Sequence, residues 1–168
     1  MIPTLQTERL TLRPYRRDDF CAYSAFMASE RSAYMGGPFD RDKAWAWFTN
    51  DVATWPLYGF GTLAMVYDDK LAGGVGLVHP PHFPEPECGW FVFDGFTGLG
   101  LATEGGRAML DHAFATTDLA SVVSYVHVEN AASVRVAEKL GGRHDPNAAK
   151  ADGDGDDTLV FRHQRGAA

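Results

Sequence analysis

The sequence predicts a mixed α/β fold in which antiparallel strands come first and a parallel β-α-β crossover comes later. Two observations carry this expectation. In the first half, two segments with period-two hydrophobic alternation flank a short turn at 68–70. In the second half, an apolar, aromatic strand at 87–93 precedes a segment with helical spacing, and a β-branched strand at 120–128 follows it. The expected order of elements is β-α-α-β-β-β-α-β-α-(β)-β.

The first half is expected to open with one strand and two helices. Residues 8–15 alternate leucines with polar residues, which is the pattern of a half-buried strand. The acidic pair Asp18 and Asp19 then suits the start of a helix, because the helix dipole favours negative charge there. A second helix is expected at 40–55. Its apolar seam would comprise Trp45, Phe48, Val52 and Trp55.

The hairpin that follows pairs residues 59–67 with residues 71–78. The glycines at positions 73, 74 and 76 lie inside the second of these strands, where they favour a bulge or close packing. The stretch 79–86 carries four prolines and is expected to be irregular.

The second half continues with a buried-face helix that starts near Leu101. Another helix is expected at 131–140, and it stops at a glycine pair, which is a favourable C-terminal signal. Residues 152–157 form a polar turn before a last strand at 158–163. No internal repeat or linker divides the chain, so residues 1–168 are expected to form a single domain.

The composition is that of an ordinary globular protein and argues against several classes of function. Of the 168 residues, 45% are hydrophobic and 22% are charged. The formal net charge of -7 argues against a nucleic-acid partner, which requires a basic patch. No apolar run is long enough to cross a membrane, and the N-terminus carries no signal-peptide pattern. Cys21 and Cys88 form no CxxC pair and the histidines show no metal-ligand spacing, so we expect a cytoplasmic protein with reduced thiols and no metal.

Gly98 and Gly100 stand between the apolar strand and the helix that starts near Leu101. The first amides of a helix have no intrahelical partner, and glycines in front of them let an anion approach the backbone. The loop is therefore a candidate pyrophosphate site. The alternative, that the glycines serve only a tight strand-to-helix turn, stays open. A dinucleotide fingerprint fails because Thr103 stands where glycine or alanine is required, and a P-loop fails because no Gly-Lys-Ser/Thr triplet follows.

Three segments of the second half, at 87–92, 98–104 and 108–114, resemble the central motif of the GNAT acetyltransferases. The closest likeness is to the branch that includes the ribosomal-protein N-terminal acetyltransferases. Residues 128–141 are similar to the second motif of that branch, and residues 7–14 to its first strand. The resemblance covers nearly the whole chain in register. It implies one GNAT domain with a single mixed, twisted sheet of about six to seven strands, a splayed centre and about four flanking helices.

The resemblance also implies how acetyl-CoA, the cosubstrate, would bind. Phe91 and Val92 would hold its pantetheine arm as a pseudo-strand where the central strands splay, and Asn130 would hydrogen-bond the arm. The pyrophosphate would lie in a cradle of backbone amides from Gly98, Leu99, Gly100, Leu101, Ala102 and Thr103. The family usually opens this loop with Gln or Arg, and Thr97 stands there in this chain. Because the cradle consists of backbone N–H groups, we expect weaker binding and not its loss.

The implied chemistry is the attack of an amine on a thioester. Glu87, at the head of the cofactor strand, would accept the proton of the amine, and the alternative is a rim glutamate that positions the substrate. Many relatives have a tyrosine acid where this chain has Ala137. Ser133, one turn earlier, is therefore the candidate hydrogen-bond donor to the CoA sulfur, unless its hydroxyl bonds its own helix backbone. A backbone N–H near Phe91 or Val92 would bind the oxyanion.

The acceptor would be a small-molecule amine or a protein N-terminus, bound by a monomer or a homodimer. Segments 34–39 and 79–86 are expected to line its pocket, because the cofactor motifs occupy the other side of the splayed sheet. His79, in the second of these segments, is the next candidate base. A non-enzymatic alternative stays open, namely a catalytically silent GNAT domain that binds acyl-CoA as a sensor or scaffold.

Overall fold

The computed structural model describes residues 1–166 and contains one eight-stranded sheet, with the strands in the order β1-β2-β3-β4-β5-β6-β8-β7. The strands are β1 (Leu5–Gln6), β2 (Leu10–Arg13), β3 (Thr62–Tyr67), β4 (Lys70–Val78), β5 (Glu87–Val92), β6 (Ser121–His127), β7 (Arg143–His144) and β8 (Thr158–Gln164). The helices are η1 (Arg17–Asp19), α1 (Phe20–Met27), η2 (Glu30–Met35), α2 (Arg41–Tyr58), α3 (Leu101–Thr116) and α4 (Ala131–Lys139).

The expected order of antiparallel strands followed by one parallel crossover is confirmed. Strands β1 to β5 pair antiparallel in succession, and β5 pairs with β6 in parallel across helix α3. The sheet has eight strands where about six to seven were expected. The extra strand is β1, whose two residues pair with β2 and are too few to show a periodic pattern in the sequence.

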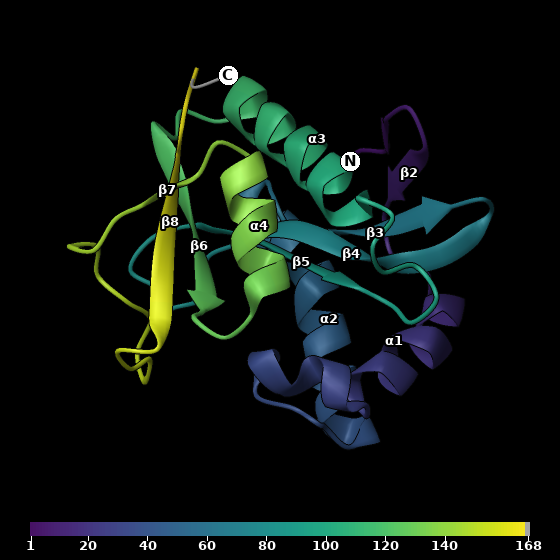
Figure 1. The fold of residues 1–168 in the computed structure, drawn as a ribbon. Coiled ribbons are helices and arrows are strands. Elements are labelled where there is room, and N and C mark those ends of the chain that lie inside the picture. The colour runs from purple at the N-terminus through teal and green to yellow at the C-terminus, as the bar shows by residue number, and fades with distance from the viewer. Residues whose placement is uncertain (167–168) are drawn as a thin grey trace.

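Helices cover both faces of the sheet (Figure 1). Helices α3 and α4 lie over one face, and α1 and α2 lie against the other. The larger hydrophobic cluster joins α3 to strands β2 to β6, and Met109 and Leu77 are both fully buried in it. The second cluster is aromatic, and it joins α1 and α2 to the end of β5 through Phe26, Phe48 and Phe93. The strand β5 is therefore covered on both faces, as its apolar sequence predicted.

The hairpin of β3 and β4 turns at Asp68 and Asp69, which both have left-handed backbone angles, φ 49° and 58°. A bulge shifts the register between Met65 and Val66. The interpretation of the strand glycines is confirmed. A Cβ atom at Gly73 would overlap the carbonyl oxygen of Phe91 on β5. The two backbones therefore approach more closely at this position than any residue with a side chain would allow.

The apolar seam predicted for α2 is wrong at two of its four positions. Trp45 is 46% exposed and Val52 is 37% exposed, whereas Phe48 and Trp55 are buried. The helix instead turns Asp51 inward, where its carboxylate accepts hydrogen bonds from the Tyr23 and Thr62 hydroxyls at 3.0 and 3.1 Å. These two partners come from α1 and β3, so tertiary contacts decided the buried face of the helix. Among the described helices, none is long and apolar enough to cross a membrane.

Candidate active site

The centre of the sheet opens because side chains replace one rung of the β5–β6 ladder. The two strands pair only at Glu87 and Val123, and Val123 N donates to the Pro86 carbonyl at 3.0 Å. A continuing parallel ladder would next bond Tyr125 N to the Cys88 carbonyl. Instead, Tyr125 N donates to Oε1 of Glu87 at 3.4 Å. We call the unpaired stretch beyond this point the β5–β6 opening.

The backbone of β5 presents alternate residues to the β5–β6 opening. Phe93 N donates to the Ala72 carbonyl at 2.8 Å, so by alternation the backbone of Phe91 bonds to β4, and the backbone N–H groups of Trp90 and Val92 face the opening. The Phe91 ring stacks on the Phe26 ring of α1, with 5.2 Å between the ring centroids. Of the two residues predicted to hold the pantetheine arm, Val92 presents its backbone N–H to the opening and Phe91 does not; Trp90, which the sequence pattern did not single out, does so as well.

Glu87 lies at the closed end of the β5–β6 opening and is half-buried. Burial raises the pKa of its carboxyl from 4.5 to about 7; the Tyr125 N–H bond opposes this rise and nearby Asp154 adds to it. Gly89 is the next residue on the same face of β5, and even a Cβ there would stand 3.7 Å from the carboxylate. The space beside the carboxylate is therefore free of a neighbouring side chain from its own strand.

Aromatic side chains gather on the face of the opening that looks away from α4. Tyr125 and His127 alternate along β6 and share this face with Glu87. The Phe83 ring meets Tyr125, and the Tyr34 ring meets His127, each at 5.1 Å between centroids. These contacts bring both segments predicted to line the acceptor pocket to β6. No motif in the sequence singles out the two β6 residues, although the period-two alternation of the strand could have placed them on this face.

The hydroxyl of Tyr125 is buried and forms no hydrogen bond of normal geometry within residues 1–166, although the Glu85 backbone lies close enough to act on its pKa. Burial raises its pKa to about 12, so the phenol stays protonated at neutral pH. A buried hydroxyl without a partner is a polar group that can still bind a ligand.

The glycine loop has the geometry predicted for an anion site. Gly98 and Gly100 have left-handed φ angles of 77° and 80°, and Gly100 is the N-cap of α3. No acceptor outside the helix is found within residues 1–166 for the N–H groups from Gly98 to Thr103. The positive end of the α3 dipole adds to these unpaired donors.

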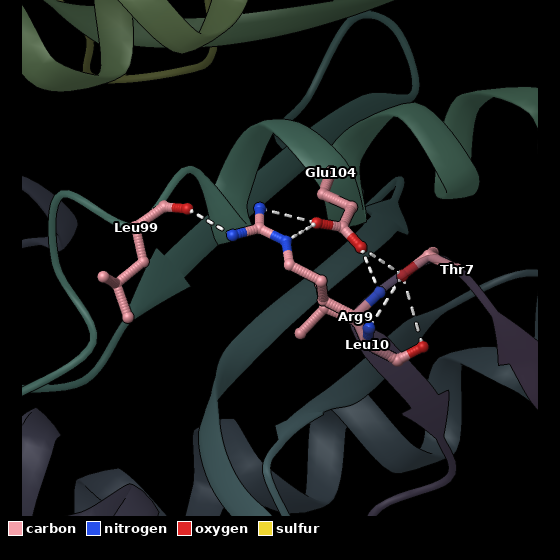
Figure 2. A network of polar contacts seen from close by, with 5 residues as sticks. All are labelled: Thr7, Arg9, Leu10, Leu99 and Glu104. Atoms are coloured by element: carbon pink, nitrogen blue, oxygen red, sulfur yellow. Dashed lines mark hydrogen bonds and ion pairs between the residues drawn. The ribbon is translucent and has the colours of Figure 1, made fainter.

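A polar network ties the loop to the N-terminal strand region (Figure 2). The Arg9 guanidinium donates to the Leu99 carbonyl at 2.9 Å and forms an ion pair with Glu104 at 2.7 Å. The Glu104 carboxylate also accepts the Arg9 backbone N–H at 2.8 Å and the Thr7 hydroxyl at 2.5 Å. Burial acts to raise the pKa of the Glu104 carboxyl, but these hydrogen bonds outweigh it and hold the pKa below its usual range. The two charged residues of this network lie 95 positions apart, so no local sequence pattern predicts it.

Asn130 and Ser133 belong to the first turn of α4. Asn130 is the N-cap, and its side-chain oxygen accepts the Ser133 N–H at 3.1 Å. The Ser133 hydroxyl accepts a hydrogen bond from Trp90 Nε1 at 3.3 Å, which joins α4 to β5. Ala137, where many relatives have a tyrosine, is fully buried against Val126, so a phenol there would require the core to repack.

Two further features of the fold bear on the site. The His79 ring packs against Tyr58 at the end of α2, with 6.2 Å between centroids. A hollow of about 990 Å³ lies between the N-terminus, α2 and the end of α3, and none of the predicted site residues lines it.

Comparisons with known proteins show which family and fold the chain resembles. A family model described as an acetyltransferase (GNAT) domain matches residues 9–143. The FsC-acetyl coenzyme A-N(2)-transacetylase of Aspergillus fumigatus is 30% identical, and the match covers 84% of this chain and 66% of that protein, just under two thirds of its length. The crystal structure of an acetyltransferase from Agrobacterium tumefaciens is 44% identical, with a TM-score of 0.92 over 98% of this chain and 95% of that one.

A more distant structure shares the fold. The ribosomal L7/L12 alpha-N-protein acetyltransferase RimL, solved in complex with coenzyme A, is 16% identical. It superposes with a TM-score of 0.78 over 99% of this chain and 100% of that chain. At this identity the similarity shows the fold alone.

Proposed function

The chain belongs to the GNAT acetyltransferase family, and on that premise we propose that it transfers an acetyl group from acetyl-CoA to the nitrogen of an amine by direct attack in a ternary complex. One observation carries the proposal. The β5–β6 opening begins at a carboxyl group whose pKa lies near 7, and the strand that borders it leads to a glycine loop with unpaired amides. A proton acceptor and an anion site thus stand at the two ends of one strand.

The cosubstrate would lie along β5. Its pyrophosphate would accept hydrogen bonds from the free N–H groups of Gly98 to Thr103, and the Arg9–Glu104 network would hold that loop in place. The backbone groups of Trp90 and Val92 that face the opening would pair with the amides of the pantetheine arm. The amide nitrogen of Asn130 forms no hydrogen bond within residues 1–166, so it can donate to the arm while the side-chain oxygen caps α4.

Acetyl-CoA supplies the acyl group as a thioester. Glu87 would accept the proton of the attacking amine, directly or through one water, since its pKa near 7 matches the working pH of a general base. The N–H of Trp90 or Val92 would stabilise the negative charge that develops on the carbonyl oxygen.

Ser133 would stabilise the leaving thiolate. Its oxygen already accepts a hydrogen bond from Trp90, which leaves its own proton available for the sulfur. This arrangement supports the role predicted for Ser133 and requires no tyrosine at position 137.

The acceptor amine would approach from the face of Tyr125 and His127. The rings of Phe83 and Tyr34 support this placement, because they bring the two predicted pocket segments to that face. We propose further that residues 1–168 act as a single acetyltransferase domain in the cytoplasm, as a monomer or homodimer.

Turnover of acetyl-CoA with a panel of amines tests the proposal. The panel should include small primary amines, polyamines and peptides with free N-termini, with release of the CoA thiol as the measurement. We expect amine-dependent release with at least one class. The second candidate function is a silent domain that senses acyl-CoA, favoured by Thr97 and Ala137 at positions where the family has other residues. CoA binding by calorimetry without turnover on any amine would support that alternative.

A further inference from the structure

A buried chain of hydrogen bonds crosses the sheet at the point where β5 and β6 separate. The Ser124 hydroxyl donates to the Cys88 carbonyl at 2.6 Å, and Oγ of Ser124 lies 3.0 Å from Nε2 of His163. The three residues come from the neighbouring strands β5, β6 and β8. Ser124 is 1% exposed and His163 is 2% exposed, so water does not compete for these bonds.

The chemistry of the groups fixes the direction of each bond. A carbonyl oxygen can only accept, so the single hydroxyl proton of Ser124 goes to Cys88. Oγ of Ser124 must then accept from His163, which places the imidazole proton on Nε2. Nδ1 carries no proton in this tautomer and forms no hydrogen bond of normal geometry within residues 1–166, although the nearby Leu140 carbonyl acts to raise the pKa of the ring. Burial lowers the pKa of His163 to about 4, so the ring is neutral at neutral pH.

The carbonyl that Ser124 occupies is the acceptor that the next rung of the ladder would need. Cys88 O accepts the short Ser124 bond, and Tyr125 N donates instead to the Glu87 carboxylate, where its bond is long at 3.4 Å. A parallel pair gains one backbone bond per rung, so the strands would otherwise tend to close by one step.

We propose that Ser124 and His163 are positioning residues: they keep β5 and β6 far enough apart for the pantetheine arm to enter the β5–β6 opening. Ser124 competes with Tyr125 N for the Cys88 carbonyl and so disfavours the closing rung, and His163 orients the serine hydroxyl from β8. The part of this inference that concerns the arm rests on the proposed function. The part that concerns the ladder does not.

The test is the exchange rate of the Tyr125 amide hydrogen, measured by NMR, in the wild type and in Ser124→Ala. Without the hydroxyl, Cys88 O is free and Tyr125 N can bond to it. We expect exchange at Tyr125 to slow by about fivefold to tenfold, because a backbone hydrogen bond would replace the long bond of 3.4 Å to Glu87. General destabilisation would move the rate the other way. Exchange that is unchanged or faster in Ser124→Ala would overturn the proposal.

Three further variants complete the experiment. Ser121→Ala removes from the same strand a hydroxyl whose one hydrogen-bond partner within residues 1–166 is Arg162, and it should leave Tyr125 exchange unchanged. Ser124→Thr keeps the hydroxyl and should behave as the wild type. His163→Phe keeps a ring and removes the donor, so exchange at Tyr125 should slow less than in Ser124→Ala; no slowing would remove His163 from the proposal. This variant also decides the matter if Ser124→Ala fails to fold.

Calorimetric titration with CoA measures the consequence for the cosubstrate. We expect the CoA dissociation constant to rise about tenfold in Ser124→Ala and to stay unchanged in Ser121→Ala. If the wild type does not bind CoA, the proposed function fails, while Tyr125 exchange still decides the role of Ser124. If Tyr125 exchange slows and CoA affinity is unchanged, the opening is not held for the pantetheine arm.

Discussion

Replacing Glu87 by glutamine tests the proposed base without changing the size of the side chain. Glutamine also keeps an oxygen that can accept the Tyr125 N–H, so the strands should stay in place. General base catalysis typically contributes about 10²–10⁴-fold. We therefore expect Glu87→Gln to lower kcat/KM by about that factor near pH 8 on the true acceptor amine.

The dependence of this loss on pH follows from two ionisations. Below the pKa of about 7, the wild-type carboxyl becomes protonated and can no longer accept a proton. Above the pKa of the amine, the acceptor loses its proton without help. The ratio of kcat/KM between the wild type and Glu87→Gln should therefore be largest between these two values and fall on either side.

The same pKa predicts an effect on stability. The folded protein holds the Glu87 proton more tightly than the unfolded chain, whose carboxyl has the ordinary value of 4.5. The wild type thus loses stability as the pH rises from about 4.5 through 7, and glutamine does not titrate. A rise from 4.5 to about 7 corresponds to at most about 3 kcal/mol. At pH 8, Glu87→Gln should be more stable than the wild type by up to that amount, and at pH 4 the two should be nearly equal.

Glu85→Gln is the matched control, two residues earlier in the chain. Hydrogen bonds from Arg162 lower the pKa of Glu85, so its contribution to stability is present at neutral pH and is lost as the pH falls. The difference between wild type and variant should therefore have the opposite sign. Denaturant unfolding from pH 4 to pH 8 measures both. A stability difference for Glu87→Gln that does not change with pH, or full activity of this variant at every pH, would refute the assignment of Glu87 as a base with a raised pKa.

Three further predictions concern the cosubstrate. Gly100→Val and Gly100→Asn should both weaken CoA binding in calorimetry. Asparagine tolerates the left-handed φ of 80° better than valine does. Unchanged affinity in Gly100→Asn would therefore show that valine acts through backbone strain. Asn130→Ala should raise KM for acetyl-CoA more than it lowers kcat, and the lost helix cap should cost about 1 kcal/mol of stability. Asn130→Asp should raise KM and keep the cap. A fall in kcat alone would contradict this role. Arg9→Lys and Glu104→Gln should each weaken CoA binding several-fold, and the double variant should be little worse than either, because both act through one network; additive losses would show separate roles.

Local signals in the sequence were sufficient where short-range geometry decides the structure. The glycines before α3 predicted a helix start with free amides, and the structure gives both glycines left-handed angles there. The alternation and turn residues of the β3–β4 hairpin predicted its pairing. Glu87 was placed at the head of its strand for the same reason, since strand boundaries follow from residues that are neighbours in the chain.

The sequence by itself determined the order of elements, the glycine loop and the strand that carries the proposed base. Only the tertiary structure decided which groups meet: Asp51 and not Trp45 faces the core from α2, and Arg9 reaches Glu104 across 95 positions. It also decided that Ser124 takes the carbonyl at which the ladder would continue. The physical reason is that periodicity reports which side of an element is apolar, whereas a hydrogen bond or an ion pair depends on the distance between two elements, and the packing of the whole chain sets that distance.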